Sequence, residues 1–159
     1  MSTLYVDTIN EKTSGNGVLI PGHVVQVVTG STATGASSTS STYADTGLTA
    51  SITPSSTSSK ILVIVNQQGC QKYTSTTGLG LKLFRGSTEL VKFEGQFGIN
   101  SNNSYDFNGG GNGVTHLDSP STTSATTYKT QFNNRNAAGG VGVQADGATS
   151  TITLMEIAQ

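Results

Sequence analysis

The sequence has little of several things that most globular proteins contain. Tryptophan is absent, proline occurs three times, and Asp, Glu, Lys and Arg together make up 11% of 159 residues. Eight Lys and Arg residues offer no basic cluster that could displace counterions from phosphates, so a nucleic-acid partner is not expected. Nine dispersed acidic residues likewise form no carboxylate cluster for an enzyme acting on carbohydrate.

A single cysteine, Cys70, excludes a disulfide within the chain. We expect its thiol to be a small buried hydrophobic group, because a reactive thiol needs a cationic neighbourhood that the sequence does not indicate. No stretch approaches 18 consecutive apolar residues, so no transmembrane span is predicted. The first residues lack a basic region followed by an apolar run, and no signal peptide is predicted.

Helical periodicity is also missing, and a period of two takes its place. No apolar residues recur at i, i+3, i+4 and i+7 over three turns. Apolar and polar residues instead alternate over short runs that end at turn residues, such as Pro21-Gly22 and Asp118-Ser119-Pro120. About eight short strands at roughly 8–12-residue spacing predict an all-β fold, a β-sandwich or jelly roll.

Serine and threonine, 45 residues together, and 20 glycines dominate what is present. Leu, Ile, Val and Phe still make up 35 of 159 residues, and the net charge is only −1, which argues against disorder. So few large side chains nevertheless make a thin core, whose burial stabilises the fold less than usual. We therefore expect contacts between copies of the chain to supply part of the core.

The chain divides into three parts by composition. Residues 1–28 are expected to form an N-terminal docking or oligomerisation arm of short β segments. A low-complexity stretch rich in Ser, Thr and Gly, residues 29–41, is typical of a flexible linker. Residues 42–159 are then the β-sandwich body. Within the body, Lys60–Gln67 is apolar on both faces and is predicted to be a central strand, and the segment Ile152–Ile157 another inner strand.

Several segments resemble small virion structural proteins of marine and cyanobacterial tailed phages. The resemblance begins with Ser2–Ile9 and, after a Gly-rich turn, Val18–Val28. The body adds Leu48–Pro54 with Ser58–Ile61, Leu117–Pro120 through Tyr128-Lys129, and the terminal Ser150–Ile157. The resemblance implies a trimeric β-structured fibre or decoration protein and carries over no catalytic residue or cofactor. The chain is short and has no repetitive shaft, so both a short fibre and a capsid decoration protein stay open.

Two groups of residues are the candidates for contacts. In the arm, alternating apolar residues are expected to dock to the particle by strand addition: Leu4, Val6, Ile9, Val18 and Ile20. In the Asn- and Gly-rich segment 95–113, aromatic and amide side chains are expected to touch a glycan or a neighbouring subunit: Tyr105, Phe107 and Asn108. His116 and Asp118 share one face of a strand, but two residues are too few to predict a metal site.

These observations predict a virion structural protein without enzymatic activity, cofactor or metal. The first hypothesis is a homotrimeric short tail fibre or fibre-like adhesin attached through its arm. The alternatives are a capsid decoration or cement protein and a lectin-like carbohydrate-binding module. The expected partners are further copies of the chain, tail, baseplate or major capsid proteins, and a host surface glycan; no membrane insertion is expected.

Overall fold

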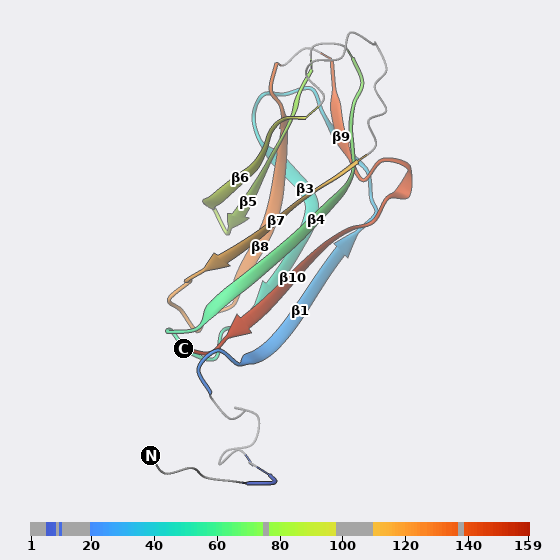
Figure 1. Cartoon of the computed structure of the whole chain (residues 1–159). Coiled ribbons are helices and arrows are strands. Elements are labelled where there is room, and N and C mark those ends of the chain that lie inside the picture. Colours follow the sequence, from blue (N-terminus) through green and yellow to red (C-terminus); the bar gives the residue numbers. More distant parts are fainter. Residues whose placement is uncertain (1–5, 9, 11–19, 75–76, 98–109, 137–138) are drawn as a thin grey trace.

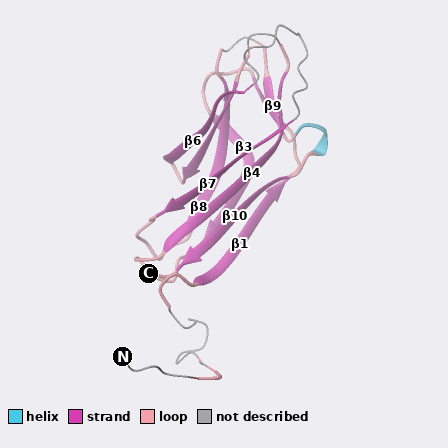
Figure 2. Cartoon of the chain, viewed as in Figure 1, coloured by secondary structure: helices cyan, strands magenta, loops and turns pink. Residues whose placement is uncertain are grey.

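Two antiparallel β-sheets face each other in the computed structural model (Figures 1 and 2). Buried side chains from both sheets form a common core, so the fold is a β-sandwich. The structure describes residues 6–8, 10, 20–74, 77–97, 110–136 and 139–159. The strands of the first sheet are β1 (Val24–Thr32), β10 (Ser150–Ile157), β4 (Lys60–Lys72), β7 (Gly110–Asp118), β9 (Val141–Val143) and β2 (Ala36–Ser38). Those of the second are β3 (Ala44–Ile52), β8 (Thr126–Asn134), β5 (Leu79–Arg85) and β6 (Thr88–Phe97). The all-β prediction is confirmed.

The eight longer strands pair in a nested order. β1 pairs with β10, β3 with β8, β4 with β7 and β5 with β6, all antiparallel. β10 also pairs with β4, and β8 with β5, which joins the nested pairs into two sheets. Such nesting places strands that are far apart in the sequence next to each other. One consequence is that the first and last strands of the body lie side by side (Figure 1).

The inner-strand predictions agree with the structure, whereas the predicted linker does not. β4 lies between β10 and β7, and β10 lies between β1 and β4. Residues 29–32, predicted to begin a flexible linker, continue β1 along β10, and residues 36–38 form β2 beside β9. The Ser- and Thr-rich composition was misleading because threonine also suits a strand that is exposed on one face. All of β1 therefore belongs to the sandwich. The predicted boundary between arm and linker, at residue 28, falls in the middle of this strand.

The apolar interior forms two clusters, one toward each end of the sandwich. The larger one gathers side chains from both sheets: Leu48, Ala50, Ile52, Ile61, Val63, Val65, Leu83, Tyr128, Ile152 and Leu154. The smaller one contains Cys70, Leu79, Leu81, Phe132, Val141 and Val143. Cys70 is fully buried, as predicted, and this burial raises the pKa of its thiol to about 11. Its thiol is therefore protonated at neutral pH and unreactive.

A layer of buried polar side chains joins the two sheets and includes Gln67, Thr130, Thr46 and Ser150. The Gln67 amide nitrogen donates to Ser150 Oγ at 3.0 Å, and its Oε1 accepts from Thr130 Oγ1 at 2.9 Å. Thr130 Oγ1 lies 2.6 Å from Thr46 Oγ1 on β3. Because a buried polar group without a partner is costly, this layer favours the native strand register.

At the end of the sandwich where β1 begins, Glu156 is a fully buried carboxylate. Its Oε1 accepts from the Ser55 backbone N–H at 2.8 Å and from Ser55 Oγ at 2.6 Å. Its Oε2 accepts from Gln26 Nε2 at 2.6 Å. Glu156 thus connects Gln26 on β1 to Ser55 in the turn after β3. Burial acts to raise the pKa of Glu156, but these hydrogen bonds outweigh it and hold the pKa below its usual value.

Acid should therefore destabilise the protein through Glu156. A carboxyl whose pKa is lowered by folding contributes fully above the unfolded-state pKa of about 4.3, and the contribution is lost as the pH falls through the folded-state value. We expect Glu156→Gln to cost about 1–3 kcal/mol at neutral pH and to flatten the loss of stability in acid. Urea unfolding from about pH 7 to pH 3 measures the stability of both proteins across this range. If the free energy of unfolding depends on pH in the same way in the variant and the wild type, Glu156 is not the source of the acid sensitivity.

Candidate functional site

The structure describes only two of the residues that the sequence singled out for contacts. Tyr105, Phe107 and Asn108 lie outside the described residues, as do Leu4, Ile9 and Val18. Val6 and Ile20 are described, and 50% and 40% of their surfaces are exposed. Neither apolar side chain is buried on the body of its own chain, so both are open to a partner.

Residues 20–23 are held by backbone hydrogen bonds to Ala158, which follows the last strand, β10. The Gly22 N–H donates to the Ala158 carbonyl at 2.8 Å, and the Ala158 N–H donates to the His23 carbonyl at 2.9 Å. A turn, in which the His23 N–H donates to the Ile20 carbonyl at 2.9 Å, then leads into β1. The N-terminal segment thus leaves the body at the end of the sheet where β1 starts and β10 stops (Figure 1).

Close to this end, an apolar row crosses the outer face of the first sheet. We define the apolar row as Val27, Met155, Leu62 and Leu117, one residue each from β1, β10, β4 and β7. Consecutive members are direct cross-strand partners, so the row runs straight across all four strands. Val27 and Leu117, at its two ends, are each about half exposed, and the two central members are partly exposed.

The exposed apolar side chains are confined to one side of the molecule. Among the described residues, every large hydrophobic side chain classed as exposed lies in the N-terminal segment or on strands of the first sheet: Val6, Ile20, Val24, Val27, Ile64 and Leu117. Scattered exposed apolar residues need no explanation, but a continuous patch marks an interaction surface.

The outer face of the second sheet carries charged pairs around one partly exposed aromatic side chain, Phe84. Lys129 Nζ lies 2.8 Å from Asp45 Oδ1, which joins β8 to β3, and Lys82 Nζ lies 2.6 Å from Glu89 Oε2, which joins β5 to β6. Lys82 also lies over the Tyr43 ring, 4.3 Å from its centre. These groups are well hydrated and would be costly to bury. The second sheet is therefore the face suited to water, and the first sheet the one suited to a partner.

The side chains of this surface are suited to burial against another apolar surface. Leucine, valine and methionine side chains exclude water against another apolar surface and offer no proton donor, nucleophile or ligand atom for a hard cation. Within the described ranges, no three His, Cys, Asp or Glu side chains gather as a metal site. Nor does any helix in them have the length and apolar character needed to cross a membrane.

Sequence reasoning missed this surface although one signal was present. The β4 segment alternates Ile61, Val63 and Val65 with Leu62 and Ile64, and this two-sided pattern was interpreted as burial within the sandwich. The structure buries only the first set and leaves the second on the outer face. A strand that is apolar on both faces but covered on one is the signal of an interface.

Neither a scan against protein-family models nor a search of curated proteins finds a match for this chain.

Proposed function

We propose that this chain is a structural subunit of a tailed-phage virion, a short tail fibre or fibre-like adhesin that works as a homo-oligomer. The observation that carries the proposal is the confinement of exposed apolar side chains to the outer face of the first sheet and the adjoining N-terminal segment. The sequence resemblance to small virion proteins supports the setting, and it implies three copies.

A second copy of this chain is the partner that best fits the surface. The apolar row contains no charged residue, so it demands no complementary charge, and it matches a copy of itself. Four strands are about 19 Å wide and eight residues about 26 Å long, which gives a footprint of about 500 Å². Stable interfaces bury about 800 Å² per partner, so the face needs additional contacts. Ile20 and Val24, at the start of β1, lie toward the same end and can supply them.

Sedimentation velocity of the full chain at about micromolar concentration tests the proposal. We expect a species at a small multiple of the 16.3 kDa chain mass, and three copies if the resemblance holds. A compact monomer at every concentration up to about 100 µM would overturn it, because an interface that weak cannot hold a particle together.

A capsid decoration or cement protein is the second candidate, because the same apolar face could pack against neighbouring shell subunits. Copy number on the particle separates the two: tens of copies indicate a fibre and hundreds a cement protein. Deletion of residues 2–19 tests attachment, because it spares β1 and the Glu156 hydrogen bonds. We expect the shortened chain to fold and fail to attach to particles; full attachment would refute a docking role for the arm.

A further inference from the structure

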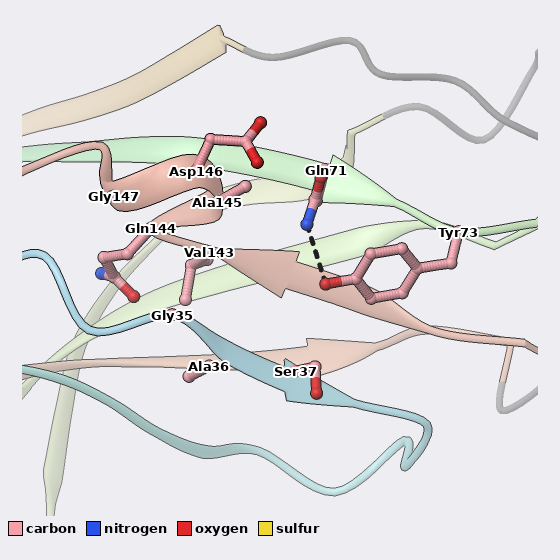
Figure 3. Close-up of a pocket in the computed structure, with 10 residues that line it drawn as sticks. All are labelled: Gly35, Ala36, Ser37, Gln71, Tyr73, Val143, Gln144, Ala145, Asp146 and Gly147. Carbon is pink, nitrogen blue, oxygen red and sulfur yellow. Dashed lines mark hydrogen bonds between the residues drawn. The ribbon is translucent and has the colours of Figure 1, made fainter.

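A polar hollow lies where β2, β9 and the end of β4 meet the 3-10 turn η1 (Ala145–Gly147), away from the apolar row (Figures 1 and 3). It encloses about 340 Å³ and is lined in part by Ser37, Gln71, Tyr73 and Asp146. A second hollow of about 280 Å³ shares Tyr73 with it, and a third of about 190 Å³ shares Gln71 and Asp146. The three hollows are therefore neighbours, and Gln71, Tyr73 and Asp146 lie between them.

Tyr73 is held in place by its neighbours. Its Oη accepts a hydrogen bond from Gln71 Nε2 at 2.8 Å (Figure 3). The ring lies against two glycines on the β9 side: a Cβ added to Gly140 would lie 2.8 Å from Cδ2 of the ring, and one on Gly142 would collide with Oη. The half-buried ring therefore depends on the absence of side chains beneath it, and it presents a hydroxyl that can also donate.

The backbone that presents Asp146 is strained and firmly anchored. Gln144 and Asp146 have positive φ values, 52° and 54°, which cost non-glycine residues about 1–3 kcal/mol each. The buried Gln144 amide nitrogen donates to Ser150 Oγ at 3.0 Å, and the Gln144 N–H donates to the Gln68 carbonyl at 2.9 Å. Ala145 packs on Gly69 so closely that a Cβ there would collide with its backbone. The backbone at Asp146 is thus held at a fixed position, and its carboxylate is exposed.

The groups around the hollow define the ligand that it would accept. Among the described residues that line it are one carboxylate, two amides and two hydroxyl groups, and none of them is Lys, Arg or His. An anionic ligand would meet an uncompensated negative charge. The described lining residues include no second carboxylate that could form a glycosidase pair with Asp146. Carboxylate and amide oxygens accept from neighbouring sugar hydroxyls, and an aromatic ring packs against sugar C–H groups.

We infer that this hollow is a binding site for a neutral saccharide, with Asp146, Gln71 and Tyr73 as the contacting side chains. The volume is near the lower end of the roughly 300–1,000 Å³ typical of ligand sites, which suits one or two sugar rings. The inference names the class of ligand that the proposed adhesin would bind. The site itself is argued from its lining residues, and only its biological role rests on the proposed function. Single sites of this kind bind weakly, and several copies in one oligomer would multiply the effect.

Binding of the full chain to an array of neutral, sialylated and sulfated glycans, followed by calorimetry with the best neutral oligosaccharide, tests the inference. We expect binding to neutral glycans, a loss of at least about tenfold in affinity for Asp146→Asn and for Gln71→Ala, and none for the matched control Asp45→Asn on the second sheet. Circular dichroism establishes that each variant is folded.

Three results would overturn the inference: no neutral glycan bound at millimolar concentration, binding to anionic glycans alone, or wild-type affinity in both site variants. The outcome is separable from that of the assembly proposal. A chain made monomeric by a change in the apolar row should keep the affinity of each single site, and Asp146→Asn should sediment as the wild type does.

Discussion

Leu117→Asp should convert the assembled protein into a folded monomer. The residue is about half exposed in the single chain, so a carboxylate there is hydrated before association and buried without a partner afterwards. Burying it should cost at least about 3 kcal/mol, which corresponds to a weakening of about 100-fold or more. Analytical ultracentrifugation over a concentration series measures the change.

A matched substitution on the other sheet distinguishes a specific interface from a general effect of charge. Thr127 is exposed on β8 of the second sheet, and Thr127→Asp adds the same charge to a strand that faces water. We expect it to sediment as the wild type does. Val27→Asp, at the opposite end of the apolar row, should behave like Leu117→Asp. If all three variants stay assembled, the outer face of the first sheet is not the interface.

Arg85→Ala should destabilise the fold strongly, because it removes the cation that pairs with a buried carboxylate. Arg85 Nη1 lies 2.9 and 2.8 Å from the two carboxylate oxygens of Asp118, whose side chain is only 8% exposed. Tyr128 Oη donates to Asp118 Oδ2 at 2.7 Å. Burial and the neighbouring carboxylate raise the pKa of Tyr128 above its usual value, so the phenol stays a donor.

Removing the guanidinium leaves the buried Asp118 carboxylate without its cation. Breaking a buried ion pair costs about 3–5 kcal/mol, and partial exposure of Arg85 reduces this to about 2–4 kcal/mol. The double variant Arg85→Ala, Asp118→Asn should recover more than half of the loss, because no charge is then left unpaired. Urea unfolding of the four chains gives the coupling energy, and simple additivity would mean that the pair is not coupled.

Much of the fold follows from the sequence because strand alternation is a local property. Val63 and Val65 on β4, and Ile152 and Leu154 on β10, predict inner strands, and both strands are central in the first sheet. β2 was missed because its three residues, Ala36–Ser38, are too few and too small to show an apolar pattern in the sequence. Burial of Asp118 was also missed, since its partner Arg85 is distant in the sequence and only the fold brings them together.

The two candidate surfaces differ in how far the sequence could predict them. Both Val6 and Ile20 are exposed, and their docking role, which stays a prediction, was inferred from the alternation of a short segment that is visible in the sequence. The apolar row was not predicted, because it depends on cross-strand register among four strands that are far apart in the chain. The polar hollow depends on the positive φ angles of Gln144 and Asp146. These angles could not be predicted from the two residue types alone.

The nested strand order also governs when the chain can begin to associate. Met155 of β10 stands between Val27 and Leu62 in the apolar row, so the row does not exist until almost the whole body has been synthesised. Pairing of β1 with β10 closes a loop that spans nearly the entire body, and such non-local sheets fold in milliseconds to seconds. Growing chains on neighbouring ribosomes therefore do not yet present the complete apolar row. The proposed association therefore has to follow folding of the body, and until β10 pairs, the apolar inner faces of the earlier strands stay exposed.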